Sequence, residues 1–320
     1  MLLTLSCAEL ALRVLDVYPP LERAYPGEHE DRSHPTFVAD AALGWRTRPG
    51  LDTTTRGALG QVRILADEAG HRTGPDRRDV GACRGTVVLA GDSFLWGVDV
   101  DWQDTVAADI EARLPLVHVA DVAQPGFGLD QAVLAFEQDG VPLRPKLVVL
   151  GVYPQDCDRC MTAFRSDFGF HKPTFVLRDG ALVAMSGADR PPALLDAVAR
   201  GSRVLGLWQR TQRTFGFRYG IGPWWALNRA LLDRLRAAAA AVPCPVLLVH
   251  IPMADWRAFP ALADYARTHA VALFDPVTEW PERPADFYIP PAGHFTPHGG
   301  RLMGERIAAW IARLVPELGG

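Results

Sequence analysis

The sequence predicts an α/β protein in which a parallel sheet of about five strands carries helices on both faces, a three-layer α/β/α arrangement. Short apolar runs such as residues 87–90 lack polar alternation, which is typical of strands buried on both faces. Stretches of helical length separate these runs, and such alternation indicates right-handed β–α–β units. Apolar residues make up 48% of the 320 residues and charged residues 22%, values typical of a globular protein with a full core.

The expected elements of the sheet domain follow one another regularly from residue 86 onward. Strands are predicted at residues 86–91, 117–123, 146–153, 245–252 and 271–275. Helices are predicted at residues 102–114, 129–138, 227–242, 256–268 and 298–314.

Two regions do not show this alternation of strands and helices. Residues 1–80 are expected to form an N-terminal helix and an extended arm of loops and short strands, ahead of the main domain at 81–320. Residues 157–225 look like an insertion between the third and fourth strands. It contains an expected hairpin that turns at Asp179-Gly180, and its residues 202–225 show no clear period.

The first twenty residues are predicted to form an amphipathic helix rather than a membrane span. Glu9 and Arg13 interrupt the apolar opening four residues apart, and no signal-peptide layout is present. The leucines expected on one side of this helix are Leu2, Leu5, Leu12 and Leu15. Association with a membrane through this end of the chain remains an expectation.

Charge and cysteine content narrow the possible partners. The net charge is −4, from 33 basic and 37 acidic residues spread along the chain, so no basic stripe indicates nucleic-acid binding. Cys157 and Cys160 form a lone C-x-x-C without the second pair or the nearby histidines that a zinc site needs. We interpret this pair as incidental or joined in a local disulfide, and we expect no metal site.

Chemistry is indicated where the predicted strands end. Ser93 follows the first buried strand, the segment 124–128 (QPGFG) follows the second, and Gln155 follows the third. His294 lies in a loop ahead of the terminal helix. Because parallel strands end at one edge of a sheet, these groups would converge as nucleophile, oxyanion donors and general base. The alternative is that Ser93 belongs to a turn that merely caps the next helix.

These motifs resemble the SGNH, or GDSL-type, hydrolases over nearly the whole chain. GDSFLWGVDV, AQPGFGLDQ, LVVLGVYPQD and GHFTPHG resemble the four ordered blocks of that family. Flanking segments such as DAALGWRTRPG and KPTFVLRDGALVAM resemble a bacterial branch that often carries an N-terminal membrane anchor. The resemblance implies a flavodoxin-like fold.

The same resemblance implies roles for individual residues. Ser93 is expected to be the nucleophile and to donate its own N–H to the oxyanion, together with the N–H of Gly126 and the amide of Gln155. His294 is expected to be the general base. Asp92 is expected to orient the loop after the strand.

Three departures from the family pattern matter. Gln155 stands where the family has asparagine, and its side chain is one methylene longer. Asp121 stands where this branch has asparagine. The family places an aspartate just before the histidine, but Ala292 stands two residues before His294 here. We therefore expect something other than a directly preceding carboxylate to orient His294, and a correspondingly slow enzyme. A backbone carbonyl, Asp275 or Asp286 are the candidates.

Other residues near the strand ends are weaker candidates. The side chains that could line a substrate pocket, or equally pack in the core, are Trp96, Phe127, Tyr153 and His250. His298 is expected in the first turn of the terminal helix.

The leading hypothesis for the function is a serine esterase that removes small O-acyl groups from a small molecule or carbohydrate without a metal or organic cofactor. One alternative is an O-acyltransferase that passes the same acyl group to an alcohol. Another is a non-catalytic binding module, suggested by the missing acid. The resemblance favours the bacterial cell envelope, or the cytoplasm if Met1 is the true start.

Overall fold

The core of the protein is one parallel sheet of five strands. The computed structural model describes residues 2–17, 20–21, 25–76, 78–291 and 293–319. The strands of this sheet are β5 (Gly85–Ala90), β6 (Val117–Asp121), β7 (Leu147–Val152), β12 (Val246–His250) and β13 (Ala272–Phe274). Their order across the sheet is β13-β12-β7-β5-β6, and every neighbouring pair is parallel. This order is that of the flavodoxin-like fold that the resemblance implied.

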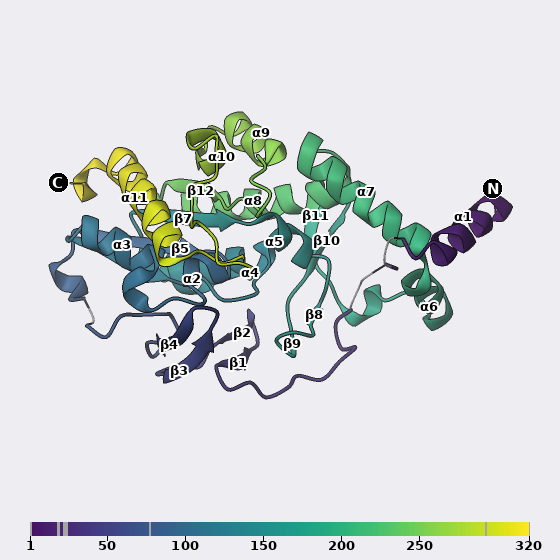
Figure 1. The fold of residues 1–320 in the computed structure, drawn as a ribbon, viewed down its shortest axis with the longest axis horizontal. Coiled ribbons are helices and arrows are strands. Elements are labelled where there is room, and N and C mark those ends of the chain that lie inside the picture. Colours follow the sequence, from purple (N-terminus) through teal and green to yellow (C-terminus); the bar gives the residue numbers. More distant parts are fainter. Residues whose placement is uncertain (1, 18–19, 22–24, 77, 292, 320) are drawn as a thin grey trace.

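Helices cover both faces of this sheet, as predicted (Figure 1). Successive strand residues point to opposite faces, so Val87 and Leu89 pack in one apolar cluster while Val88 and Ala90 pack in the other. On the first face lie α3 (Val106–Arg113) and α11 (Pro297–Leu314). On the second face lie α4 (Leu129–Ala135), α8 (Gly222–Ala241) and α9 (Pro260–Thr268).

The strand order fixes where ligands can bind. Helical connections leave β5 toward one edge of the sheet and β7 toward the other, which makes the gap between these two strands a topological switch point. In open α/β sheets, ligands bind at the carboxyl ends of the strands at such a point. The short helix α2 (Ser93–Trp96) begins there, directly after β5.

The N-terminal arm packs against the sheet domain as two hairpins. They are β1 (Phe37–Asp40) with β2 (Gly44–Thr47), and β3 (Asp52–Gly57) with β4 (Gly60–Leu65). Trp45 of β2 is completely buried against Phe127 and donates its indole N–H to the carbonyl of Pro125 at 3.0 Å. The arm therefore reaches the loop that follows β6.

The N-terminal helix forms as predicted. Helix α1 spans Leu2–Val14; of the leucines expected on one side, Leu5 is exposed, Leu12 is half-buried, and Leu15 lies exposed just beyond the helix. Polar contacts hold α1 to the insertion: Glu9 accepts hydrogen bonds from the backbone N–H groups of Arg203 and Val204. No helix in the described part of the chain is both long and apolar enough to cross a bilayer.

The insertion between β7 and β12 contains more helix than the sequence predicted. Its first elements are α5 (Pro154–Arg159), β8 (Phe164–Arg165), β9 (Phe170–His171) and the predicted hairpin of β10 (Phe175–Arg178) with β11 (Ala181–Ala184). Helices α6 (Ala193–Gly201) and α7 (Arg203–Tyr219) follow and extend away from the sheet with α1 (Figure 1). Residues 202–225 show no clear period in the sequence, yet α7 forms there, because this helix buries only part of its surface.

Element boundaries differ slightly from the predictions. Helix α4 ends in a wide turn at Phe136–Gly140, α9 begins four residues later than predicted, and α10 (Pro276–Glu279) follows β13.

Candidate active site

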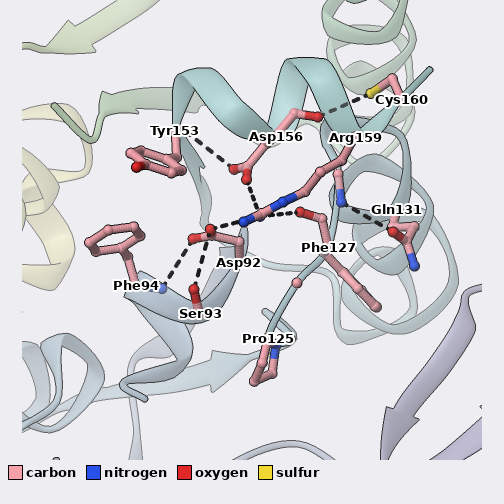
Figure 2. A network of polar contacts seen from close by, with 12 residues as sticks. Asp92, Ser93, Phe94, Pro125, Phe127, Gln131, Tyr153, Asp156, Arg159 and Cys160 are labelled. Atoms are coloured by element: carbon pink, nitrogen blue, oxygen red, sulfur yellow. Dashed lines mark hydrogen bonds and ion pairs between the residues drawn. The ribbon is translucent and has the colours of Figure 1, made fainter. Parts of the chain in front are cut away.

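Ser93 is the first residue of α2, at the carboxyl end of β5. Asp92 caps the helix, because its Oδ1 accepts a hydrogen bond from the N–H of Phe94 at 3.0 Å (Figure 2). This is the orienting role expected for Asp92. The Oγ of Ser93 lies 3.4 Å from Asp92 Oδ2, and Ser93 itself is 6% exposed.

His294 lies beside Ser93, although 201 positions separate the two residues in the chain. Its Nε2 is 3.0 Å from the Oγ of Ser93. A β-bridge between Tyr288 and Phe295 closes the loop that carries His294, and the ring of Phe94 packs edge-on against the imidazole at 5.3 Å. The side chain is 24% exposed, so the imidazole is held in place yet remains accessible.

The second nitrogen of His294 contacts a carboxylate that was not expected from the sequence. Asp99 Oδ2 lies 2.9 Å from His294 Nδ1. The expectations of a backbone carbonyl, Asp275 or Asp286 are therefore wrong. Residue Ala292 lies outside the described residues, so its position is not compared.

Asp275 is engaged elsewhere in a second histidine–carboxylate pair. Its Oδ1 lies 2.9 Å from Nδ1 of His250, which is buried at the end of β12. Burial alone would raise the pKa of Asp275, but the hydrogen bond and charge of His250 hold it below the usual value. For Asp286, the backbone carbonyl accepts the hydroxyl hydrogen of Thr296.

Asp99 is held in place by backbone groups of the N-terminal arm. The N–H of Ala58, in the turn between β3 and β4, donates to Asp99 Oδ1 at 2.8 Å. The N–H of Arg63 donates in the same way to Asp101 Oδ1 at 2.8 Å. Asp99 has a φ of 71°, an unfavourable conformation for a residue other than glycine unless its surroundings fix it.

Arg72 fixes the backbone around Asp99. It is buried, and its guanidinium donates to the carbonyls of Trp96 at 2.9 Å, Val100 at 2.5 Å and also Gly97. Burial lowers the pKa of Arg72 to about 10, although the negative charge of Asp121 acts to raise it. Gly97 has a φ of 82°, and a side chain there would collide with Thr105.

The two remaining oxyanion candidates lie in the loops after β6 and β7. Gly126 is buried with a φ of 79°, and a Cβ at this position would collide with the ring of Phe168. Its carbonyl accepts a hydrogen bond from Arg165 at 2.7 Å. Gln155 is exposed in the first turn of α5, so its side chain is free to turn toward a ligand.

Most of the pocket candidates are packed in the core. Trp96, Phe127 and His250 are at most 2% exposed, so they do not line an open pocket in this structure. Tyr153 is half-buried with its ring 4.9 Å from that of Phe94, and it is the candidate that a ligand could reach. His298 is exposed in the first turn of α11, as predicted.

Asp121, the departure upstream of Gly126, stabilises the turn after β6. Its Oδ1 accepts from the N–H of Ala123 at 3.1 Å, and burial raises its pKa to about 8. Next to this turn, Gln124 accepts from Thr47 and donates to the carbonyl of Gly70 at 3.0 Å, which ties the same loop to the arm.

The cysteines are unpaired. Cys157 in α5 and Cys160 directly after this helix are buried free thiols, so the local disulfide is not formed. Cys160 instead accepts a hydrogen bond from the N–H of Asp130 at 3.4 Å. Within the described ranges, no three histidine, cysteine or acidic side chains gather in a way that could hold a metal ion.

Asp99 was not expected as the partner of His294, because no motif next to the histidine points to it. One signal was present: Asp99, Asp101 and Asp104 all follow Ser93 within eleven residues. Nothing in the sequence distinguishes which of the three faces the histidine. No sequence pattern points to Arg72, because it lies in the arm and donates its hydrogen bonds to backbone carbonyl groups near Asp99.

Among the comparisons with known proteins, similarity is found to solved structures. No family model and no curated protein sequence matches this chain. Among solved structures, TesA is 14% identical with a TM-score of 0.46, and the similarity covers 72% of this chain and 99% of that one. A GDSL-like lipase from Bacteroides thetaiotaomicron is 14% identical with a TM-score of 0.42, covering 72% and 89%. A lipase/acylhydrolase from Enterococcus faecalis is 16% identical with a TM-score of 0.40, covering 71% and 95%.

Proposed function

We propose that this protein is a serine esterase of the SGNH type, which hydrolyses small acyl esters through an acyl-enzyme on Ser93. One observation carries the proposal. Ser93 Oγ, the imidazole of His294 and the carboxylate of Asp99 form a continuous chain of contacts at 3.0 Å and 2.9 Å. Hydroxyl, imidazole and carboxylate in this order are what proton removal from a serine requires.

The proposed reaction has two halves. Ser93 Oγ attacks the ester carbonyl carbon while His294 Nε2 takes the hydroxyl proton, and Asp99 stabilises the resulting imidazolium. His294 then gives the proton to the departing alcohol oxygen. In the second half, water attacks the acyl-enzyme with His294 as base, which releases the acid and restores Ser93. The N–H groups of Ser93 and Gly126, with the amide of Gln155, would hold the oxyanion.

The proposed substrate class rests on the resemblance and not on a cavity. The small cavity that borders Ser93 is lined by residues such as Val100, Thr105 and Gly300, and its lining does not include His294, Gly126 or Gln155. An acetyl ester of a small molecule or carbohydrate is the substrate class that we propose.

The contact between Asp99 and His294 also bears on the two alternative functions, a binding module and an acyltransferase. The binding-module hypothesis rested on the lack of an acid for His294, and the contact at 2.9 Å removes that reason. The acyltransferase differs only in whether an alcohol or water accepts the acyl group, so it shares every residue named above.

Labelling with a fluorophosphonate probe tests the proposal. We expect wild type to be labelled and Ser93→Ala to remain unlabelled, with parallel results for hydrolysis of p-nitrophenyl acetate. A folded wild-type protein that neither reacts with the probe nor hydrolyses the ester would contradict the proposal. Adding alcohols to the hydrolysis assay separates esterase from transferase, because a transferase forms the new ester in preference to free acid.

A further inference from the structure

Arg159, the last residue of α5, places one guanidinium nitrogen between three acceptors. Its Nη1 lies 3.1 Å from Asp92 Oδ2, 2.8 Å from the carbonyl oxygen of Phe127 and 2.5 Å from Asp156 Oδ1 (Figure 2). The Arg159 side chain is 17% exposed, so these contacts are largely shielded from water.

The three acceptors belong to the three segments that follow β5, β6 and β7 at the carboxyl edge of the sheet. Asp92 directly precedes Ser93, and Phe127 directly follows Gly126. Asp156 directly follows Gln155, and its Oδ2 accepts from the N–H of Tyr153 at 3.3 Å, which closes the first turn of α5. Arg159 thus connects the neighbours of the proposed nucleophile and of both remaining oxyanion donors.

The same guanidinium serves two buried carboxyl groups. The side chains of Asp92 and Asp156 are 1% and 4% exposed. Burial and the charge of Asp92 raise the pKa of Asp156 well above its usual range. Burial would lower the pKa of Arg159, but the charges of Asp156 and Asp92 raise it above the usual value. The guanidinium of Arg159, 3.1 Å from Asp92 Oδ2, is therefore placed to balance the charge of Asp92.

The charge at Asp92 matters because Oδ2 of this residue faces Ser93. The serine hydroxyl has two possible acceptors, Asp92 Oδ2 at 3.4 Å and His294 Nε2 at 3.0 Å. Attack on an ester requires the hydroxyl proton to point to His294. An unbalanced carboxylate this close would attract that proton and would oppose the negative charge that develops on the substrate oxygen.

We propose that Arg159 is a positioning residue of the esterase: it occupies and neutralises Asp92 Oδ2, directs the Ser93 hydroxyl to His294, and holds the Gly126 loop through the Phe127 carbonyl. This inference rests on the proposed function, because it assigns a role in that reaction. Arg159 does not touch the substrate. It acts through Asp92 and through the backbone beside Gly126.

The test compares four variants with wild type. Arg159→Met keeps the length of the side chain and removes its charge, and Arg159→Lys keeps the charge. Arg159→Met combined with Asp92→Asn removes the charge that Arg159 balances while keeping an acceptor for the N–H of Phe94. Arg213→Met is the matched control. Arg213 of α7 is exposed and pairs with Asp158, the residue directly before Arg159 in α5.

We expect Arg159→Met to lower kcat for p-nitrophenyl acetate by about 10²-fold with KM changed less than threefold, the size of effect seen when an oxyanion donor is lost. The rate of fluorophosphonate labelling at Ser93 should fall in parallel. Arg159→Lys should stay within about tenfold of wild type, since it keeps the counter-charge. The Asp92→Asn change should restore at least tenfold to the Arg159→Met protein, and Arg213→Met should behave as wild type.

Two results would overturn the inference while leaving the proposed function intact. One is wild-type labelling and turnover by Arg159→Met. The other is that Arg159→Met with Asp92→Asn is no faster than Arg159→Met alone. That result is expected if Arg159 only holds the three segments together. If Arg159→Met does not fold, Arg159→Gln replaces it in the same two comparisons. Absence of Ser93 labelling in wild type, by contrast, would reject the proposed function and this inference with it.

Discussion

The carboxylate of Asp99 lies 2.9 Å from Nδ1 of His294, across 195 positions of the chain. This contact supplies the acid that the segment before His294 lacks. It also makes the N-terminal arm part of the site, because the arm donates to the other oxygen of Asp99. Asp99 comes six residues after Ser93 in the chain. One of its carboxylate oxygens contacts His294, and the other accepts from the arm.

Asp99→Asn should lower kcat sharply. In the serine-protease template, the equivalent change costs about 10⁴ in kcat, because the histidine is held in the wrong tautomer and its charged form loses a partner. We expect a loss of similar order for hydrolysis of p-nitrophenyl acetate. The matched control is Asp275→Asn, which alters a histidine–carboxylate pair with the same 2.9 Å spacing away from Ser93. Equal losses in the two variants would argue against a specific role for Asp99.

Arg72→Met should weaken both stability and activity. It leaves the carbonyls of Trp96, Gly97 and Val100 without their buried donor, which should cost on the order of 3 kcal/mol of unfolding free energy. It also frees the segment that carries Asp99, and displacement of a catalytic group by about 1 Å can reduce kcat by about 10². Urea unfolding and ester hydrolysis measure the two effects. Arg63→Met, which removes an exposed ion pair with Asp52 on the same arm, should change neither by much.

Gln155→Ala tests whether the side-chain amide holds the oxyanion. If it does, kcat should fall by about 10²–10³ with little change in KM, since the interaction forms only in the transition state. Gln138→Ala, in the wide turn after α4, is the control with the same substitution. A loss of less than threefold would assign the oxyanion to the backbone N–H groups of Ser93 and Gly126.

Stability should depend on pH through His71, which links the arm to the sheet domain. Burial disfavours its charged form, but hydrogen bonds to Asp139 and Asp67 outweigh burial and raise its pKa to about 9. Arg46 also pairs with Asp139. The folded protein therefore binds the proton more tightly than the unfolded chain does. This stabilisation is complete below the ordinary pKa of 6.5 and is lost as the pH rises through about 9.

The measurement is the urea unfolding free energy of wild type and His71→Gln at pH 6 and pH 9.5. Wild type should be more stable than the variant by about 3 kcal/mol at pH 6, and the difference should largely disappear at pH 9.5. A difference that is the same at both pH values would show that the charged form of His71 contributes nothing.

The sequence by itself determined the sheet and the edge at which chemistry is expected. Residues 87–90, and the strands like them, are apolar without alternation, and only a parallel sheet covered on both faces buries such runs. Once the strands are known, the topology brings Ser93, Gly126 and Gln155 to one edge, because every strand of such a sheet ends on the same side. The approach of His294 to Ser93 was expected as well, because the loop ahead of the terminal helix can return to this edge of the sheet.

The tertiary structure alone decided the partners of these groups. Asp99, Asp101 and Asp104 are equivalent in the sequence, and only the fold of the loop after α2, with Asp99 at a φ of 71°, selects the one that faces His294. Arg72 and Arg159 act through carbonyls and carboxylates of segments distant in the chain, so no local pattern marks them. Strand and helix formation depends on residues a few positions apart, which a sequence displays directly. The contacts that orient His294 and Asp92 depend on how separate loops and the arm pack together, and the physical reason for their choice is found only in the packed structure.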